Sequence, residues 1–184
     1  MRIVLTGFGA FPGVEMNPSA HLVECLPLDL PPLAGHEVGV HVLPVTYRAC
    51  AEWAGRALSP EPPDILLHIG VRASASGFEL ERMGRNVCRL DLADAEGAYW
   101  PAPAVVPEGP AMLPATLPAD ELQARLVPAN LPLGLSDDAG GYVCNFIHYH
   151  SLWQVQQRRA HTWAGFLDIP QVAGLDPAHP KQCP

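Results

Sequence analysis

Short apolar runs rich in β-branched residues alternate with segments of helical spacing along this chain of 184 residues. The apolar runs predict strands over residues 2–6, 37–45, 64–69, 131–135 and 162–169, and an extended segment over 77–86. The segments between them predict helices over residues 17–26, 46–58, 119–126 and 142–157. Strands that alternate with helices form a largely parallel, twisted sheet with helices on both faces. We therefore expect one three-layer α/β domain over residues 1–184.

Residues 91–110 interrupt this alternation. They are rich in proline, alanine and aspartate and have no periodic apolar pattern. A loop of this length in a compact domain either carries function or forms an interface. We expect a surface excursion here, and the proline-rich stretch from Pro101 to Pro118 is a candidate contact between copies of the chain.

The composition excludes several classes of function. With 48% hydrophobic and 16% charged residues, the chain is too apolar to be disordered, and no apolar run approaches the roughly 18 residues of a membrane span. A formal charge of −8 without a basic cluster argues against nucleic acid as a partner. The start of the chain is too rich in glycine for a signal peptide. Five widely spaced cysteines in a chain without a signal peptide predict free thiols in the cytoplasm. The sequence has no pair of metal-ligating residues at a suitable spacing, so we expect no metal site.

Cys144 is the strongest chemical candidate from its position alone. It follows a glycine-rich turn, residues 136–141, and lies near the start of the helix predicted over 142–157. The helix dipole and free N–H groups stabilise a thiolate at such a place, and the same N–H groups can bind an oxyanion. The alternative is a small buried hydrophobe, because most cysteines are not nucleophiles. Glu81, taken alone, would be an ordinary strand charge.

Five segments, read together, resemble the pyroglutamyl peptidase I family, also called the pyrrolidone-carboxylate peptidases. They follow the family's order and spacing over nearly the whole chain, and the cysteine segment is the most specific. The segments are Thr6-Gly7-Phe8-x-x-Phe11-x-Gly13-x-x-x-Asn17-Pro18-Ser19, Glu81-Arg82-x-x-x-Asn86, Gly109-Pro110-Ala111 with Thr116-Leu117-Pro118, Ser136-x-x-Ala139-Gly140-x-Tyr142-Val143-Cys144-Asn145-x-x-x-Tyr149, and Gly165-Phe166-x-x-x-Pro170.

The resemblance implies an α/β enzyme that removes an N-terminal pyroglutamyl residue from small peptides. It implies a Cys-His-Glu arrangement without metal or cofactor, in which Cys144 is the nucleophile and Glu81 the orienting acid. Phe8 and Phe11 would line the pocket, since aromatic walls suit a flat neutral lactam. Asn17 would support the pocket loop or, equally, only cap the helix that follows it. Assembly into dimers or tetramers is implied as well.

One position breaks the family's motif Gly-Phe-x-His-x-Pro, because Asp168 stands where the catalytic histidine belongs. Imidazole accepts the thiol proton and later donates one to the leaving amine, whereas a carboxylate of ordinary pKa is a poor acid at neutral pH. A second negative charge beside Cys144 would raise the thiol pKa, and two carboxylates at one site predict a raised pKa for Glu81 or Asp168. Loss of the general base commonly costs on the order of 10⁴–10⁶ in rate.

Two further departures from the family concern the backbone. The family has Gly-Gly-Arg after its third strand, but this chain reads Gly70-Val71-Arg72-Ala73-Ser74-Ala75, so the glycines that permit close backbone approach are missing. The chain also ends at Pro184, about where the family's terminal helix would begin, and we expect that helix to be absent.

His148 is a candidate substitute base. It lies four residues after Cys144, one turn along the same helix face, and Asp168 could orient it; the alternative is an ordinary surface or interface histidine. Three hypotheses follow. The chain is a pyroglutamyl-peptidase-type hydrolase with impaired or altered activity, a binding or vestigial homologue that keeps the fold, or an esterase or amidase of another small substrate, since an activated ester needs less leaving-group protonation.

Overall fold

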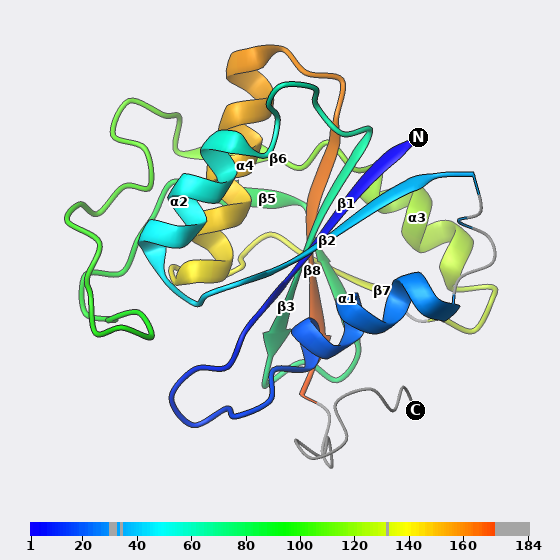
Figure 1. Ribbon diagram of the computed structural model, residues 1–184, viewed down its shortest axis with the longest axis horizontal. Coiled ribbons are helices and arrows are strands. Elements are labelled where there is room, and N and C mark those ends of the chain that lie inside the picture. The colour runs from blue at the N-terminus through cyan, green and yellow to red at the C-terminus, as the bar shows by residue number, and fades with distance from the viewer. Residues whose placement is uncertain (30–32, 34, 132, 172–184) are drawn as a thin grey trace.

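A computed structural model describes residues 1–29, 33, 35–131 and 133–171 of the chain. Within these residues, six strands form a central sheet in the order β2-β1-β3-β8-β4-β7 (Figure 1). The parallel strands are β1 (Arg2–Phe8), β2 (Glu37–Leu43), β3 (Ile65–Arg72) and β8 (Trp163–Pro170). β4 (Phe78–Glu81) runs antiparallel to β8, and β7 (Leu133–Ser136) is parallel to β4. The predicted, largely parallel sheet is confirmed, with its last two strands reversed.

Helices cover both faces of this sheet (Figure 1). α1 (Pro18–Asp29) and α3 (Ala119–Leu126) lie on one face, and α2 (Tyr47–Arg56) and α4 (Val143–Arg158) lie on the other. Alternation along β1 produces the two layers, because Ile3 and Leu5 pack with α1 whereas Val4 packs into the core beneath α2 and α4. The expected three-layer α/β domain is therefore present in the described residues. The expected loss of a terminal helix concerns residues outside them.

The excursion over residues 91–110 is held by two polar side chains and a short strand pair. Asn86 bonds the main chain of Val106 in both directions, at 2.8 and 2.9 Å. Asp94 is buried and accepts the N–H groups of Glu96 at 3.0 Å and Tyr47 at 3.2 Å. The strand pair joins β5 (Met83–Arg85) to β6 (Met112–Pro114). β6 was not predicted from the sequence, because three residues are too few to form a periodic pattern.

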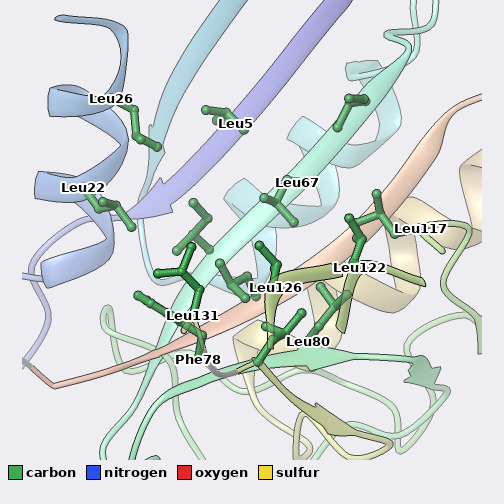
Figure 2. A pocket seen from close by; sticks show the side chains of 14 residues that line it. Leu5, Leu22, Leu26, Leu67, Phe78, Leu80, Leu117, Leu122, Leu126 and Leu131 are labelled. Atoms are coloured by element: carbon green, nitrogen blue, oxygen red, sulfur yellow. The ribbon is translucent and has the colours of Figure 1, made fainter. Parts of the chain in front are cut away.

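An apolar cavity of about 400 Å³ separates α1 from α3 on their face of the sheet (Figure 2). Leu22 and Leu26 of α1 border it on one side, and Leu122 and Leu126 of α3 border it on the other. Leu67 of β3 is part of its lining. Every lining side chain among the described residues is apolar, so none of them can orient a reacting ligand by a polar contact.

Three cysteines of the described residues, Cys50, Cys88 and Cys144, are free thiols, as expected. Among the helices of the described residues, none is long and apolar enough to cross a membrane.

The packing of α1 on β1 requires glycine at position 7. A Cβ atom there would lie 2.7 Å from the carbonyl carbon of Ser19, which is main chain and cannot turn aside. We expect Gly7→Ala to lower the free energy of unfolding by about 2–3 kcal/mol, as overpacking does. Gly55→Ala is the matched control, because α2 leaves open space there, and it should stabilise by about 0.5–1 kcal/mol. Urea denaturation of both variants would measure this, and equal effects would contradict the packing argument.

Candidate active site

A cavity of about 500 Å³ opens where the ends of β3 and β8 meet the start of α4. Carboxyl ends of parallel strands and helix N-termini gather on one edge of an α/β sheet, which is where such folds bind ligands. The lining residues are Val71, Arg72, Ser74, Ser136, Asp138, Ala139, Gly140, Tyr142, Cys144 and Asp168. Within the described residues, no three His, Cys, Asp or Glu side chains are grouped to hold a metal ion.

Cys144 is the second residue of α4 and is partly exposed to this cavity. Gly140, with φ of 76°, forms the left-handed turn that precedes the helix. Gly70 of β3 makes room for the thiol, because a Cβ atom there would lie 3.2 Å from Cys144 Sγ and 2.5 Å from the ring of Phe166. The sulfur therefore lies between a helix N-terminus and the bare backbone of a central strand.

The thiol of Cys144 is not activated in this environment. Its pKa is raised to about 12, chiefly by burial. The charges of Asp168 and Glu81 also raise this pKa, and Arg72 and a backbone hydrogen bond lower it by a smaller amount. Desolvation and two nearby carboxyl groups therefore destabilise the thiolate more than the helix N-terminus stabilises it.

Arg72 is the residue that the sequence analysis missed. Its Nη2 atom donates to Asp168 Oδ2 at 2.9 Å, to the main-chain oxygen of Asp138 at 3.0 Å and to Glu81 Oε1, and its Nε atom lies 3.4 Å from Glu79 Oε2. One guanidinium thus faces carboxylates from two strands. The only signal in the sequence was an arginine within the run Gly70–Ala75, and register pairing alone brings it to β4 and β8.

Glu81 and Asp168, in contrast, meet as the sequence analysis expected. Glu81 is completely buried at the end of β4, and Asp168 on β8 is 3% exposed. Burial and a hydrogen bond with Asp168 raise the pKa of Glu81 to about 7, against the opposing effects of Ser136 and Arg72. Burial also raises the pKa of Asp168, although its bonds to Glu81 and Arg72 oppose this. The site therefore holds a pair of carboxyl groups that resists full ionisation.

His148 lies one turn after Cys144 but is not bonded to it. Its ring is fully buried and packs 5.9 Å from the ring of Phe166. Neither ring nitrogen has a hydrogen-bond partner in the described part of the chain, and burial lowers the pKa of His148 to about 3. An imidazole of this kind is a weak base, and the cavity wall itself contains no histidine among the described residues.

The two aromatic side chains predicted for the pocket lie beside the site. Phe8 is 2% exposed and packs with Phe166, whose ring centre is 6.4 Å away. Phe11 is partly buried and joins Val14 in an isolated β-bridge. Neither is among the residues that line the 500 Å³ cavity. Phe8 instead supports Phe166, which in turn lies against Gly70.

Asn17 performs both of the roles that the sequence left open. Its Oδ1 atom accepts the N–H of Ser19 at 3.1 Å, which caps the start of α1. Its Nδ2 atom donates to the main-chain oxygen of Gly9 at 3.1 Å, and the Ser19 hydroxyl accepts the N–H of Phe8 at 2.9 Å. These bonds connect the loop after β1 to the helix that follows it.

Comparison with known proteins places this geometry among peptidases. The pyroglutamyl peptidase family matches residues 1–179. The pyrrolidone-carboxylate peptidase of Thermococcus onnurineus is 34% identical over 184 residues, which cover 98% of this chain and 90% of that protein. The enzyme of the same name from Deinococcus radiodurans is 35% identical over 184 residues, covering 99% of this chain and 84% of that protein.

Solved structures agree with the sequence comparison. A mutant pyrrolidone carboxyl peptidase from Pyrococcus furiosus superimposes with a TM-score of 0.85 at 28% identity, covering 94% of this chain and 82% of that chain. The fold of this chain is therefore the fold of the pyrrolidone carboxyl peptidases.

Removal of Arg72 should destabilise the fold in a pH-dependent way. Arg72→Gln leaves two buried carboxyl groups without a countercharge, and we expect it to lower the free energy of unfolding by about 3 kcal/mol at pH 8. This is the low end of the range for a buried ion pair, because Arg72 is partly exposed. Folded-state pKa values above the unfolded ones mean that these groups take up protons as pH falls, so the loss should shrink at pH 5. Urea denaturation at both pH values measures this. Arg82→Gln, which breaks an exposed pair with Asp137, should change little.

His148 should make the protein sensitive to acid. Its pKa is near 3 in the folded state and about 6.5 when unfolded, so its contribution is complete above pH 6.5 and is lost as pH falls. When the pH falls from 8 to 5, the free energy of unfolding should therefore decrease by about 2 kcal/mol less in His148→Leu than in the native chain. His161→Leu, the same change at an exposed histidine, is the matched control for this measurement. Hydrolysis that disappears in His148→Leu while folding is retained would instead favour His148 as the base.

Proposed function

The chain belongs to the pyroglutamyl peptidase family, and on that premise we propose that it is a slow thiol hydrolase of peptides with an N-terminal pyroglutamyl residue. Cys144 is the nucleophile of this proposal. The observation that carries it is the place of the thiol, which faces a cavity at the N-terminus of α4 inside a fold shared with pyrrolidone carboxyl peptidases. Assembly into dimers or tetramers and a location in the cytoplasm stay predictions from the sequence.

The start of α4 supports acyl transfer. The first helical hydrogen bond runs from the N–H of Phe146 to the oxygen of Tyr142, at 2.9 Å. The N–H groups before Phe146 therefore have no partner within the helix. Such groups stabilise the negative oxygen that develops when a thiolate attacks a carbonyl carbon.

Slow turnover follows from the protonation of the thiol and from Asp168. A thiol whose pKa is about 12 is ionised in roughly one molecule in 10⁵ at pH 7. In our proposal Asp168 occupies the histidine position of the family, so a buried carboxyl group paired with Arg72 replaces imidazole. We infer impaired or altered activity from this exchange of groups.

The same observations favour one other function, a homologue that binds pyroglutamyl peptides without hydrolysing them. A protonated thiol, and a cavity wall whose described residues include no histidine, are what such a protein would have. Calorimetric titration of native chain and of Cys144→Ala with a pyroglutamyl dipeptide distinguishes the two. Binding in both forms, with no hydrolysis by either, would favour the binding protein over the hydrolase.

Hydrolysis of a chromogenic pyroglutamyl anilide tests the proposed function. We expect slow turnover by the native chain that Cys144→Ala abolishes. Asp168→His should raise kcat/KM at pH 7.5 by a factor of about 10² or more, because imidazole can both accept the thiol proton and protonate the leaving amine. Asp138→His, the same change on the exposed wall of the cavity, should not.

Each alternative outcome has a clear meaning. Turnover that Cys144→Ala leaves unchanged would exclude Cys144 as the nucleophile. Native turnover as fast as that of Asp168→His would contradict the impairment. If the native chain instead hydrolyses activated esters efficiently and anilides not at all, the esterase or amidase of another substrate would be favoured, since an activated ester needs no proton on its leaving group.

A further inference from the structure

Two buried carboxyl groups share one arginine beside the cavity. Glu81 and Asp168 are both buried, and Arg72 Nη2 donates to both of them. Two ionised carboxylates cannot hydrogen-bond to each other, because neither has a hydrogen to donate. Arg72 already occupies Glu81 Oε1 and Asp168 Oδ2, and Glu81 Oε2 has no donor partner among the described residues. A proton held by the pair supplies the missing donor.

The charges around the pair favour keeping that proton. Arg72 on β3 is the positive charge that contacts the pair, and it is shared with Glu79 on β4, whose Oε2 is 3.4 Å from Arg72 Nε. Ser136 at the end of β7 and the main chain of Asp138 complete the polar surroundings, and Cys144 on α4 lines the same cavity as Asp168. One guanidinium opposite three carboxyl groups leaves excess negative charge, which a proton relieves.

We propose that the Glu81–Asp168 pair is the proton carrier of this site and takes the part that imidazole plays in a Cys-His-Glu arrangement. This inference rests on the proposed function. Asp168 lines the cavity together with Cys144 and exchanges protons with the reacting groups. Glu81 lies behind it without access to the cavity, so it is a positioning residue that acts through the shared hydrogen bond.

The reaction balances with this carrier. The fully ionised pair accepts the proton of the Cys144 thiol while the sulfur forms a bond to the scissile carbonyl carbon. The pair, now with one shared proton, gives that proton to the leaving nitrogen as the C–N bond breaks. Water then adds to the thioester carbon and passes a proton to the pair, and that proton returns to the Cys144 sulfur as the C–S bond breaks. The sum is one amide and one water converted to one acid and one amine.

The titration of the pair suits this task. Burial and the mutual bond raise the pKa of Glu81 to about 7, close to the ordinary imidazole value of about 6.5. A group that gains and loses its proton near the working pH is an efficient carrier. A carboxylate of ordinary pKa would be a poor acid at neutral pH, but the buried pair has a raised pKa and does not share this defect.

The pH profile of Cys144-dependent turnover tests the carrier. In the native chain, kcat/KM should rise with pH through about 7, as the pair loses its proton. Glu81→Gln should remove this rise between pH 6 and 8 and lower kcat roughly 10²-fold with little change in KM, because its amide donates to Asp168 and returns that group to an ordinary carboxylate. Asp168→Asn should lower kcat at least as much. Glu79→Gln is the matched control: it also contacts Arg72 and should keep the rise, moved to lower pH because one of the three negative charges is gone.

Carboxyl-carbon NMR of the native chain gives a readout that does not depend on turnover. We expect one carboxyl titration near neutral pH that disappears in Glu81→Gln. Carboxyl groups that all titrate below pH 5, or Cys144-dependent turnover whose pH profile is unchanged by Glu81→Gln, would overturn the carrier and leave the proposed hydrolase standing. A neutral titration without any Cys144-dependent turnover would instead confirm the shared proton, and would overturn the hydrolase together with the carrier's part in it.

Discussion

The site depends on one guanidinium that neutralises buried carboxyl groups from two strands. Arg72 extends from the end of β3 and bonds Glu81 on β4 and Asp168 on β8. These are the strands where the parallel and the reversed parts of the sheet meet, so the ion pairs also join the two parts of the fold. Removal of one partner from a buried pair leaves an uncompensated charge, which is far more destabilising than loss of an exposed pair.

Low solvent access sets the chemistry of this region in a consistent direction. Burial disfavours every charged form, so it raises the pKa of Cys144 and of Glu81 and lowers the pKa of His148. The same burial that lowers the pKa of His148 brings that of a carboxyl group into the range where imidazole normally works. In our proposal a buried aspartate serves as a proton carrier because a second carboxyl group shares the proton.

The fold was largely predictable from the sequence, and the site only in part. Alternation of β-rich and helical segments predicts the parallel core and helices such as α3, whose residues 119–126 were all expected. The turn before Cys144 was expected from the residues themselves and the meeting of Glu81 with Asp168 from the resemblance, and both agree with the geometry. The reversed direction of β4 and β7 was not, because a periodic pattern shows which face of a strand is buried but not which way the strand runs. Phe8 packs in the core instead of the cavity wall, since an aromatic side chain suits either place.

By itself, the sequence determined the layered α/β architecture, the position of Cys144 at a helix N-terminus and the carboxyl group at position 168, because local periodicity, turn residues and side-chain chemistry are written along the chain. Only the tertiary structure decided what surrounds Asp168. Strand register places Arg72 and Glu81 beside it, although 96 residues separate Arg72 from Asp168 in the sequence. The pKa of a buried group depends on its neighbours in space and on its access to water. The neighbours that would let Asp168 share a proton are therefore visible only in the fold.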